Sequence, residues 1–222
     1  MKKILVISPH MDDEVIGLGG VICKYIKEGY HLKVCFVCNR AYEHKYKEEL
    51  IEEEKNNALK AKGILRYQEH TFLDLYDEKT DEKLINVIIP IENIVQSYKP
   101  NIVFIPHKGD INQDHRSVFD ASMVALRSYS SPFVEAIYSY EVPSSTEQSA
   151  SFVEYTFLPN FYVNIKEYIE TKKEALSCYQ KEKREFPHPR SIKAIEILAQ
   201  MRGIAVNFEY AEAFEVIKVK NK

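Results

Sequence analysis

Short apolar runs alternate with longer amphipathic segments from residue 3 to about residue 130. Two runs are almost continuously apolar, which is typical of strands buried in a parallel sheet: KILVIS (3–8) and NIVFIP (101–106). HLKVCFVC (31–38) and EHTFLDL (69–75) predict two further strands. Apolar residues at helical spacing between and after them predict helices over 21–29, 43–62, 84–98 and 114–127. This alternation predicts an α/β layered domain with a largely parallel sheet.

The remainder of the chain continues with both kinds of element. AIYSYEVP (136–143) and AEAFEVIKV (211–219) predict two more strands, and helices are predicted over 165–183 and 191–201. The basic residues of the longer helix are expected to form a solvated face: Lys172, Lys173, Lys181, Lys183 and Arg184. The polar stretch PSSTEQSAS (143–151) predicts an exposed loop. Neither a repeat nor a linker interrupts the pattern, so we expect a single domain over 1–222.

Composition narrows the class of protein. Of the 222 residues, 45% are hydrophobic and 28% are charged, which excludes a disordered chain, a collagen and a coiled-coil rod. The net charge of −3 argues against nucleic acid or an anionic membrane as a partner. No run approaches the roughly 18 apolar residues of a membrane span. The four cysteines do not suggest a disulfide framework, and the CxxC of Cys35 and Cys38 lies in a predicted strand. We expect a cytoplasmic protein.

Two polar clusters follow two of the predicted strands. Residues 9–14 (PHMDDE) come after KILVIS, and residues 107–116 (HKGDINQDHR) come after NIVFIP. Because the carboxyl ends of parallel strands meet at one edge of a sheet, we expect the two clusters to lie together. Buried carboxylates need a compensating positive charge, from Lys108, Arg116 or a divalent cation. Two imidazoles and one carboxylate with an open fourth position form a recurring catalytic zinc site, although imidazole also suits other first-row metals.

The two clusters also resemble the motifs of a known family. HMDDE is similar to the (A/P)HPDDE motif of the PIG-L/LmbE-like zinc-dependent N-deacetylases, with Met11 in place of the usual proline, and DINQDHR is similar to their second motif. FPHPRS and RGIAVNFEYAEAF resemble C-terminal stretches of one bacterial branch. The resemblance implies a single-domain, Rossmann-like α/β/α sandwich with a metal site at the carboxyl ends of the strands. It also implies removal of an acetyl group from an amino sugar, usually a conjugate of N-acetylglucosamine.

The resemblance assigns roles to four residues of the clusters. Carried onto this chain, His10, Asp13 and His115 hold the metal, and Asp12 is the general base beside it. The expected chemistry is attack of metal-activated water on the amide, with Asp12 taking the proton and returning it to the leaving amine. The cofactor is expected to be Zn²⁺ or another divalent first-row metal.

Further residues are assigned to the oxyanion, to the ligands and to the substrate. The family's oxyanion donor is a histidine three residues before the metal histidine, and here that position is Asn112, so the donor is expected to be Asn112, His107 or His188. Asp110 and Asp114 are expected to orient the ligand imidazoles. Four residues are candidates for binding the substrate: Arg40, Arg116, Arg190 and His188.

Simpler interpretations stay open for most of these residues. The acidic residues after His10 favour a helix N-terminus, Asp114 is a good N-cap, and Asn112 suits a turn. His107 and His188 are compatible with inert loop positions. GLGG (17–20) does not match a dinucleotide fingerprint, and the acidic residues before it would repel a pyrophosphate, so close helix packing is the better explanation.

Three other functions also stay open. They are an amidase acting on a thiol-sugar conjugate or an acylated antibiotic, a catalytically weak protein that binds sugar or metal, and, last, a Rossmann-type transferase or dehydrogenase. The expected partner is a small N-acetylated amino sugar conjugate, with neither nucleic acid nor a membrane span involved. The resemblance adds homo-oligomerisation, which is common in the family.

Overall fold

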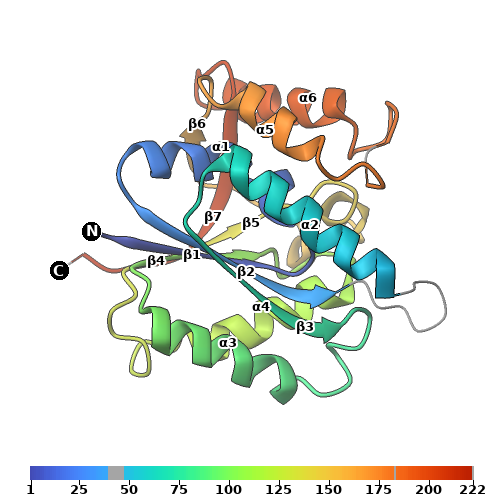
Figure 1. Ribbon diagram of the computed structural model, residues 1–222. Helices are drawn as coiled ribbons and strands as arrows, with labels where there is room; N and C mark the ends of the chain where they lie inside the picture. The colour runs from blue at the N-terminus through green and yellow to red at the C-terminus, as the bar shows by residue number, and fades with distance from the viewer. Residues whose placement is uncertain (40–47, 183, 222) are drawn as a thin grey trace.

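A seven-stranded sheet in the order β3-β2-β1-β4-β5-β7-β6 runs through the part of the chain that the computed structural model describes, residues 1–39, 48–182 and 184–221 (Figure 1). Strands β1 to β5 are parallel to one another, whereas β7 is antiparallel to β5 and β6 is antiparallel to β7. The strands are β1 (Lys3–Ser8), β2 (His31–Asn39), β3 (Glu69–Tyr76), β4 (Ile102–Pro106), β5 (Ala136–Tyr140), β6 (Phe161–Asn164) and β7 (Ala211–Val219).

Helices cover both faces of the sheet and complete three layers. They are α1 (Asp13–Lys27), α2 (Glu48–Leu65), α3 (Ile85–Tyr98), α4 (Gln113–Ala125), α5 (Ile169–Leu176) and α6 (Ile192–Ile204), with short 3-10 turns at Thr146–Gln148 and Val153–Tyr155. Figure 1 shows α1, α2, α5 and α6 on one face and α3 and α4 on the other. The side chains of β1 alternate between two hydrophobic cores. Ile4 and Val6 pack into one core, and Leu5 and Ile7 pack into the other. The predicted mostly parallel α/β/α sandwich is confirmed.

The strand order explains why the two polar clusters meet. Strand β1 pairs with β2 on one side and with β4 on the other. After β1 the chain continues to β2, whereas after β4 it continues to β5, which lies in the opposite direction along the sheet. A crevice at the carboxyl ends of two such strands is where open α/β sheets bind their ligands. Residues 9–14 and 107–116 therefore lie at the same edge of the sheet.

Several elements differ from the sequence prediction. The predicted helix 165–183 is reduced to α5, because the backbone N–H of Ile165 instead bonds the carbonyl of Tyr210 beside β7, and the chain turns after Leu176. β6 was not predicted, since four residues carry little periodicity. Helix α1 begins at Asp13 and includes the GLGG segment, and α2 continues through Gly63 to Leu65.

One prediction about exposure was wrong, and a second was wrong for part of its stretch. Lys172 is only 4% exposed and does not belong to a solvated face, because its ammonium group pairs with the equally buried Glu212. In the stretch 143–151, Ser145 and Thr146 are buried, since their hydroxyls donate to the carboxylate of Asp110. Lys183 lies outside the described residues. Among the described helices, none is both long enough and apolar enough to cross a membrane.

Candidate metal centre and active site

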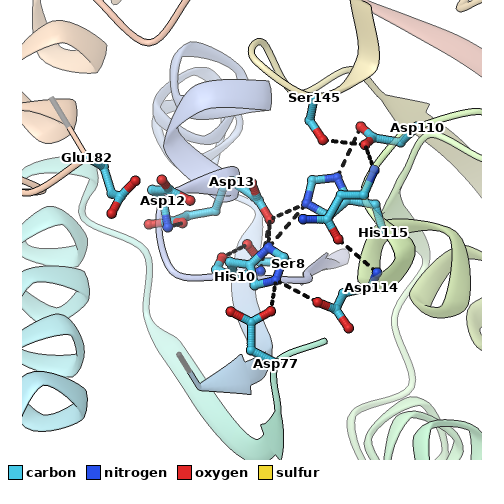
Figure 2. A network of polar contacts seen from close by, with 12 residues as sticks. Ser8, His10, Asp12, Asp13, Asp77, Asp110, Asp114, His115, Ser145 and Glu182 are labelled. Atoms are coloured by element: carbon cyan, nitrogen blue, oxygen red, sulfur yellow. Dashed lines mark hydrogen bonds and ion pairs between the residues drawn. The ribbon is translucent and has the colours of Figure 1, made fainter. Parts of the chain in front are cut away.

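Three ligand atoms from the two clusters form a nearly equilateral triangle. His10 Nδ1 lies 3.2 Å from His115 Nε2 and 3.4 Å from Asp13 Oδ2, and His115 Nε2 lies 3.3 Å from Asp13 Oδ2 (Figure 2). His10 comes from the loop after β1, Asp13 is the first residue of α1, and His115 lies in the first turn of α4. All three side chains are buried. The fold thus brings together the residues that were predicted to hold a metal.

The triangle has the dimensions of a divalent metal site. Ligand atoms about 2.0–2.2 Å from a tetrahedral zinc lie roughly 3.2–3.6 Å from one another. Asp13 Oδ1 is buried and has no hydrogen-bond partner among the described residues, which is costly unless a cation compensates it. Two imidazole nitrogens 3.2 Å apart cannot both carry a proton toward each other, whereas both can direct lone pairs at one cation. The residues present therefore fit a metal ion.

Electrostatics at the triangle favour positive charge. Burial opposes protonation of His115, but the carboxylates of Asp13 and Asp110 outweigh it and raise its pKa to about 9. Burial likewise opposes protonation of His10, and contacts with Asp114, Asp13 and Asp77 raise its pKa well above the usual value. The surrounding carboxylates thus impose a negative potential, which a bound cation would neutralise.

Outer carboxylates hold the two imidazoles from behind. His10 Nε2 lies 3.0 Å from Asp77 Oδ1 and 3.3 Å from Asp114 Oδ2, so its Nδ1 lone pair is directed into the triangle. His115 Nδ1 lies 3.1 Å from Asp110 Oδ2 in an ion-pair contact that is not well aligned for a hydrogen bond. Such carboxylate–histidine contacts orient metal ligands and raise their basicity.

The outer carboxylates are themselves anchored by hydrogen bonds. Asp114 accepts from the backbone N–H of Glu78 at 3.0 Å and from the Thr80 hydroxyl at 2.5 Å. Asp110 accepts from the Thr146 hydroxyl at 2.8 Å and from Ser145. Asp110 and Asp114 thus each lie beside one imidazole of the triangle, and their role in orienting metal ligands stays a prediction.

Asp77 is a site residue that the sequence reasoning missed. It directly follows β3, is 5% exposed and contacts His10. The rule that placed residues 9–14 and 107–116 at the carboxyl ends of strands applies equally to EHTFLDLY followed by Asp77, so the signal was present. Cys38, near the end of β2, forms a second buried group with His10 and Asp114. Burial raises the pKa of the Cys38 thiol well above its usual value.

Asp12 lies next to the triangle and is held in an unusual backbone conformation. Its φ is 133°, a region that non-glycine residues rarely adopt, and its side chain is fully buried. The Asp12 N–H donates to Glu14 Oε2 at 3.1 Å, and Arg190 Nη1 donates to Asp12 Oδ2 at 3.1 Å. Figure 2 shows Asp12 beside Asp13, on the side facing Glu182. A strained, buried carboxylate beside the ligands is suited to a role in proton transfer.

Glu14 supports the backbone conformation of Asp12 by accepting its N–H. Burial raises its pKa to about 8, and the Tyr179 hydroxyl donates to its Oε1 at 2.6 Å. Two hydrogen bonds to backbone carbonyls fix the loop after β1. The Ser8 hydroxyl donates to the His10 carbonyl at 2.7 Å, and the Cys38 N–H donates to the Pro9 carbonyl at 2.8 Å.

The structure separates the three candidates for the oxyanion donor. Asn112 is the N-cap of α4, and its Oδ1 accepts from the Asp114 N–H at 2.8 Å, which directs its NH₂ group elsewhere. His107 lies 3.0 Å from Glu215 Oε2 through Nδ1 and 3.0 Å from the Tyr155 carbonyl through Nε2, so both of its nitrogens are already engaged. His188 is exposed, and its Nδ1 accepts from the Arg190 N–H at 3.1 Å.

The arginines assigned to substrate differ in their surroundings. Arg190 reaches Asp12, Glu182 and the Ser144 hydroxyl and lies at the site. Arg116 donates to the backbone carbonyls of Asp110 and Ile111 and so stabilises the loop between β4 and α4. Arg40 lies outside the described residues.

Comparison with known proteins bears directly on this site. The family model described as "PIG-L: GlcNAc-PI de-N-acetylase" matches residues 5–126, which is more than half of the chain and includes both clusters. The chain belongs to the PIG-L family.

Relatives of this PIG-L protein are named as deacetylases. It is 28% identical over 187 residues to "Uncharacterized deacetylase YaiS" of Escherichia coli (strain K12), covering 81% of this chain and 91% of that protein. It is 25% identical over 194 residues to "Diacetylchitobiose deacetylase" of Thermococcus kodakarensis, covering 81% of this chain and 70% of that protein. The predicted family is confirmed, and this is a deacetylase family.

Solved structures share the fold. The N,N'-diacetylchitobiose deacetylase of Pyrococcus horikoshii superposes with a TM-score of 0.78 at 20% identity, covering 97% of this chain and 84% of that one. The hydratase GalB of Pseudomonas putida KT2440 also reaches 0.78, at 19% identity and with 100% and 98% coverage. Because this PIG-L fold is shared with a hydratase, the reaction has to be argued from the site.

Proposed function

We propose that this PIG-L protein is a metal-dependent hydrolase that removes the N-acetyl group from a small amino sugar conjugate of the N-acetylglucosamine type. The observation that carries the proposal is the triangle of His10 Nδ1, Asp13 Oδ2 and His115 Nε2, with the buried carboxylate of Asp12 beside it. Two imidazoles and one carboxylate favour Zn²⁺, and other divalent first-row metals also suit the set. When bound, such a cation supplies a Lewis acid that polarises an amide carbonyl and acidifies water.

The residues of this chain then divide the proton transfers. As the water oxygen adds to the amide carbon, Asp12 accepts the proton that this oxygen loses. As the carbon–nitrogen bond breaks, Asp12 returns that proton to the nitrogen, so that a free amine and acetic acid leave, and the acid then loses its proton to solvent as acetate. The Arg190 guanidinium, 3.1 Å from Asp12 Oδ2, orients the base.

The remaining residues position the ligands and the substrate. Asp77, Asp114 and Asp110 hold the two imidazoles. We assign the oxyanion donor to the NH₂ group of Asn112, because its oxygen is bound at the N-cap, whereas both nitrogens of His107 are engaged. Arg190 and Arg116 are the proposed contacts for sugar hydroxyls or an attached group.

Metal removal combined with an assay of amine release tests this function. Dialysis against a chelator is expected to abolish release of amine from N-acetylglucosamine derivatives, and about one equivalent of Zn²⁺ is expected to restore it. Release from other amides but from no N-acetyl sugar would favour the alternative amidase. Full metal occupancy without release from any amide would favour a binding protein.

A further inference from the structure

Helix α1 is interrupted about one turn after Asp13, the proposed metal ligand at its start. Leu18 has φ −150° and ψ 26°, which is not helical, so residues 13–17 form a first turn that is separate from residues 19–27. A single isolated turn has little stability of its own. Yet this turn begins at the proposed metal ligand Asp13, and the Asp12 carbonyl accepts from the N–H groups of Val15 and Ile16 at 3.0 and 2.9 Å. Something outside α1 must hold it.

A buried ion pair bridges the interruption. Lys172 Nζ donates to the Ile16 carbonyl at 2.8 Å, and Glu212 accepts from the N–H groups of Gly20 and Val21 at 3.0 and 2.7 Å. In a regular helix the carbonyl of Ile16 and the N–H of Gly20 are partners, since they are four residues apart. Here the two side chains contact those two groups and also contact each other at 2.6 Å.

The pair comes from the far end of the chain and is fully enclosed. Lys172 lies in α5 and Glu212 in β7, and each is 4% exposed. A Cβ at Gly20 would lie 2.8 Å from Ile165, so the second half of α1 packs directly against the segment leading to α5. Burying two charges costs desolvation that apolar residues of similar volume would avoid, so stability alone is a weak reason for such a pair.

We propose that Lys172 and Glu212 are positioning residues that hold the first turn of α1 and thereby set Asp12 and Asp13 relative to the metal. The link is short: the N–H of Ile16 bonds the Asp12 carbonyl, and the carbonyl of the same residue bonds Lys172. The inference rests on the proposed function for its consequence in catalysis. It rests on the structure alone for the claim that the pair restrains residues 13–17.

Three variants and a matched control test this inference in the full-length protein. Lys172→Met removes the ammonium and keeps an unbranched chain. Lys172→Met combined with Glu212→Leu removes both charges, so that neither is left buried alone. Lys172→Arg restores a donor. Lys173→Met is the control, because the neighbouring Lys173 pairs with Glu170 and Glu196 and makes no contact with α1 in the hydrogen bonds and ion pairs of the described residues.

The readouts are Zn²⁺ affinity by chelator competition, hydrogen exchange of residues 13–17 in the metal-free protein, and kcat and KM separately. In folded Lys172→Met we expect Zn²⁺ affinity and kcat to fall by about 10-fold or more, with faster exchange of the first turn and little change in KM. Lys172→Arg is expected to recover part of each effect, and Lys173→Met to resemble the wild type. If Lys172→Met does not fold, the double variant decides.

Wild-type Zn²⁺ affinity and wild-type exchange of residues 13–17 in a folded variant would overturn the inference. A wild-type protein that binds no divalent metal would instead overturn the proposed function. In that case the exchange of residues 13–17 still decides whether Lys172 and Glu212 restrain the turn.

Discussion

His10 Nδ1 and His115 Nε2 lie 3.2 Å apart although 105 residues separate them in sequence. The contact exists because β1 and β4 are neighbours in the sheet and the two histidines follow their carboxyl ends. Both rings are backed by carboxylates, Asp77 and Asp114 behind His10 and Asp110 behind His115. The carboxylates therefore fix the orientations of both rings, which would reduce the cost of assembling the proposed metal site.

Replacing the proposed base should separate metal binding from catalysis. Asp12→Asn keeps the shape of the side chain but removes its capacity to accept a proton, so we expect kcat to fall about 10²-fold or more with metal content unchanged. The measurement is metal analysis together with steady-state kinetics of amine release. Asp120→Asn, at an exposed position of α4, is the control. Activity above a few per cent of wild type would show that another group is the base.

Asp77 should matter for metal affinity although it is not a proposed ligand. Asp77→Asn weakens the contact that directs the His10 Nδ1 lone pair into the triangle, so Zn²⁺ affinity should fall by about 10- to 100-fold. Competition with a chelator of known affinity measures the change. Asp74→Asn changes an exposed carboxylate of β3 that pairs with Lys55, and it should leave metal affinity unaltered. Equal affinities in the two variants would contradict the assignment.

The contact between His107 and Glu215 should make stability depend on pH. Burial opposes protonation of His107, but the Glu215 carboxylate and the Tyr155 carbonyl outweigh it and raise the pKa of His107 above 6.5. The folded protein therefore binds this proton more tightly than the unfolded chain does. The resulting stabilisation is complete below about pH 6.5, the pKa of an unperturbed histidine, and is lost as the pH rises through the raised value.

Denaturant unfolding of wild type and His107→Gln between pH 5.5 and 9 measures this effect. The difference in free energy of unfolding between the two proteins should be largest at the acidic end and shrink toward pH 9. A difference that does not change with pH would mean that folding leaves the pKa of His107 unchanged, and this would contradict the prediction. His31→Gln, at a partly exposed histidine on the opposite edge of the sheet, serves as the control.

Much of the fold was accessible from local pattern. β1 matches its predicted bounds at both ends, and β2, β4, α3 and α6 begin and end within three residues of theirs, because alternation and helical spacing act over a few residues. The rule for strand ends then placed residues 9–14 and 107–116 at one edge of the sheet, and the family resemblance selected His10, Asp13 and His115 from these two clusters. Asp77 obeys the same rule, but it was missed because it is a single acidic residue after a predicted strand whose eight residues are all exposed or half-buried, and not part of a polar cluster.

The burial of Lys172 could not be predicted from the local sequence pattern. Its neighbours Lys173 and Lys181 are charged and more exposed, and nothing in the sequence around it separates it from them. Lys172 is buried because its ammonium group donates to the Ile16 carbonyl at the interruption in α1, 156 residues earlier, and because it pairs with Glu212 of β7. Ser145 and Thr146 show the same limit, since a polar stretch is buried only when a distant carboxylate, here Asp110, requires its hydroxyls.

The sequence by itself determined the layered α/β architecture, the family and the edge of the sheet at which polar groups gather, because periodicity and strand direction are local properties of the chain. Only the tertiary structure decided which polar side chains meet, how each ligand imidazole is backed, and that a lysine and a glutamate bridge the interruption in α1. Those outcomes depend on the pairing of buried charges and hydrogen-bonding groups across long sequence separations, where satisfying a desolvated group outweighs any local preference.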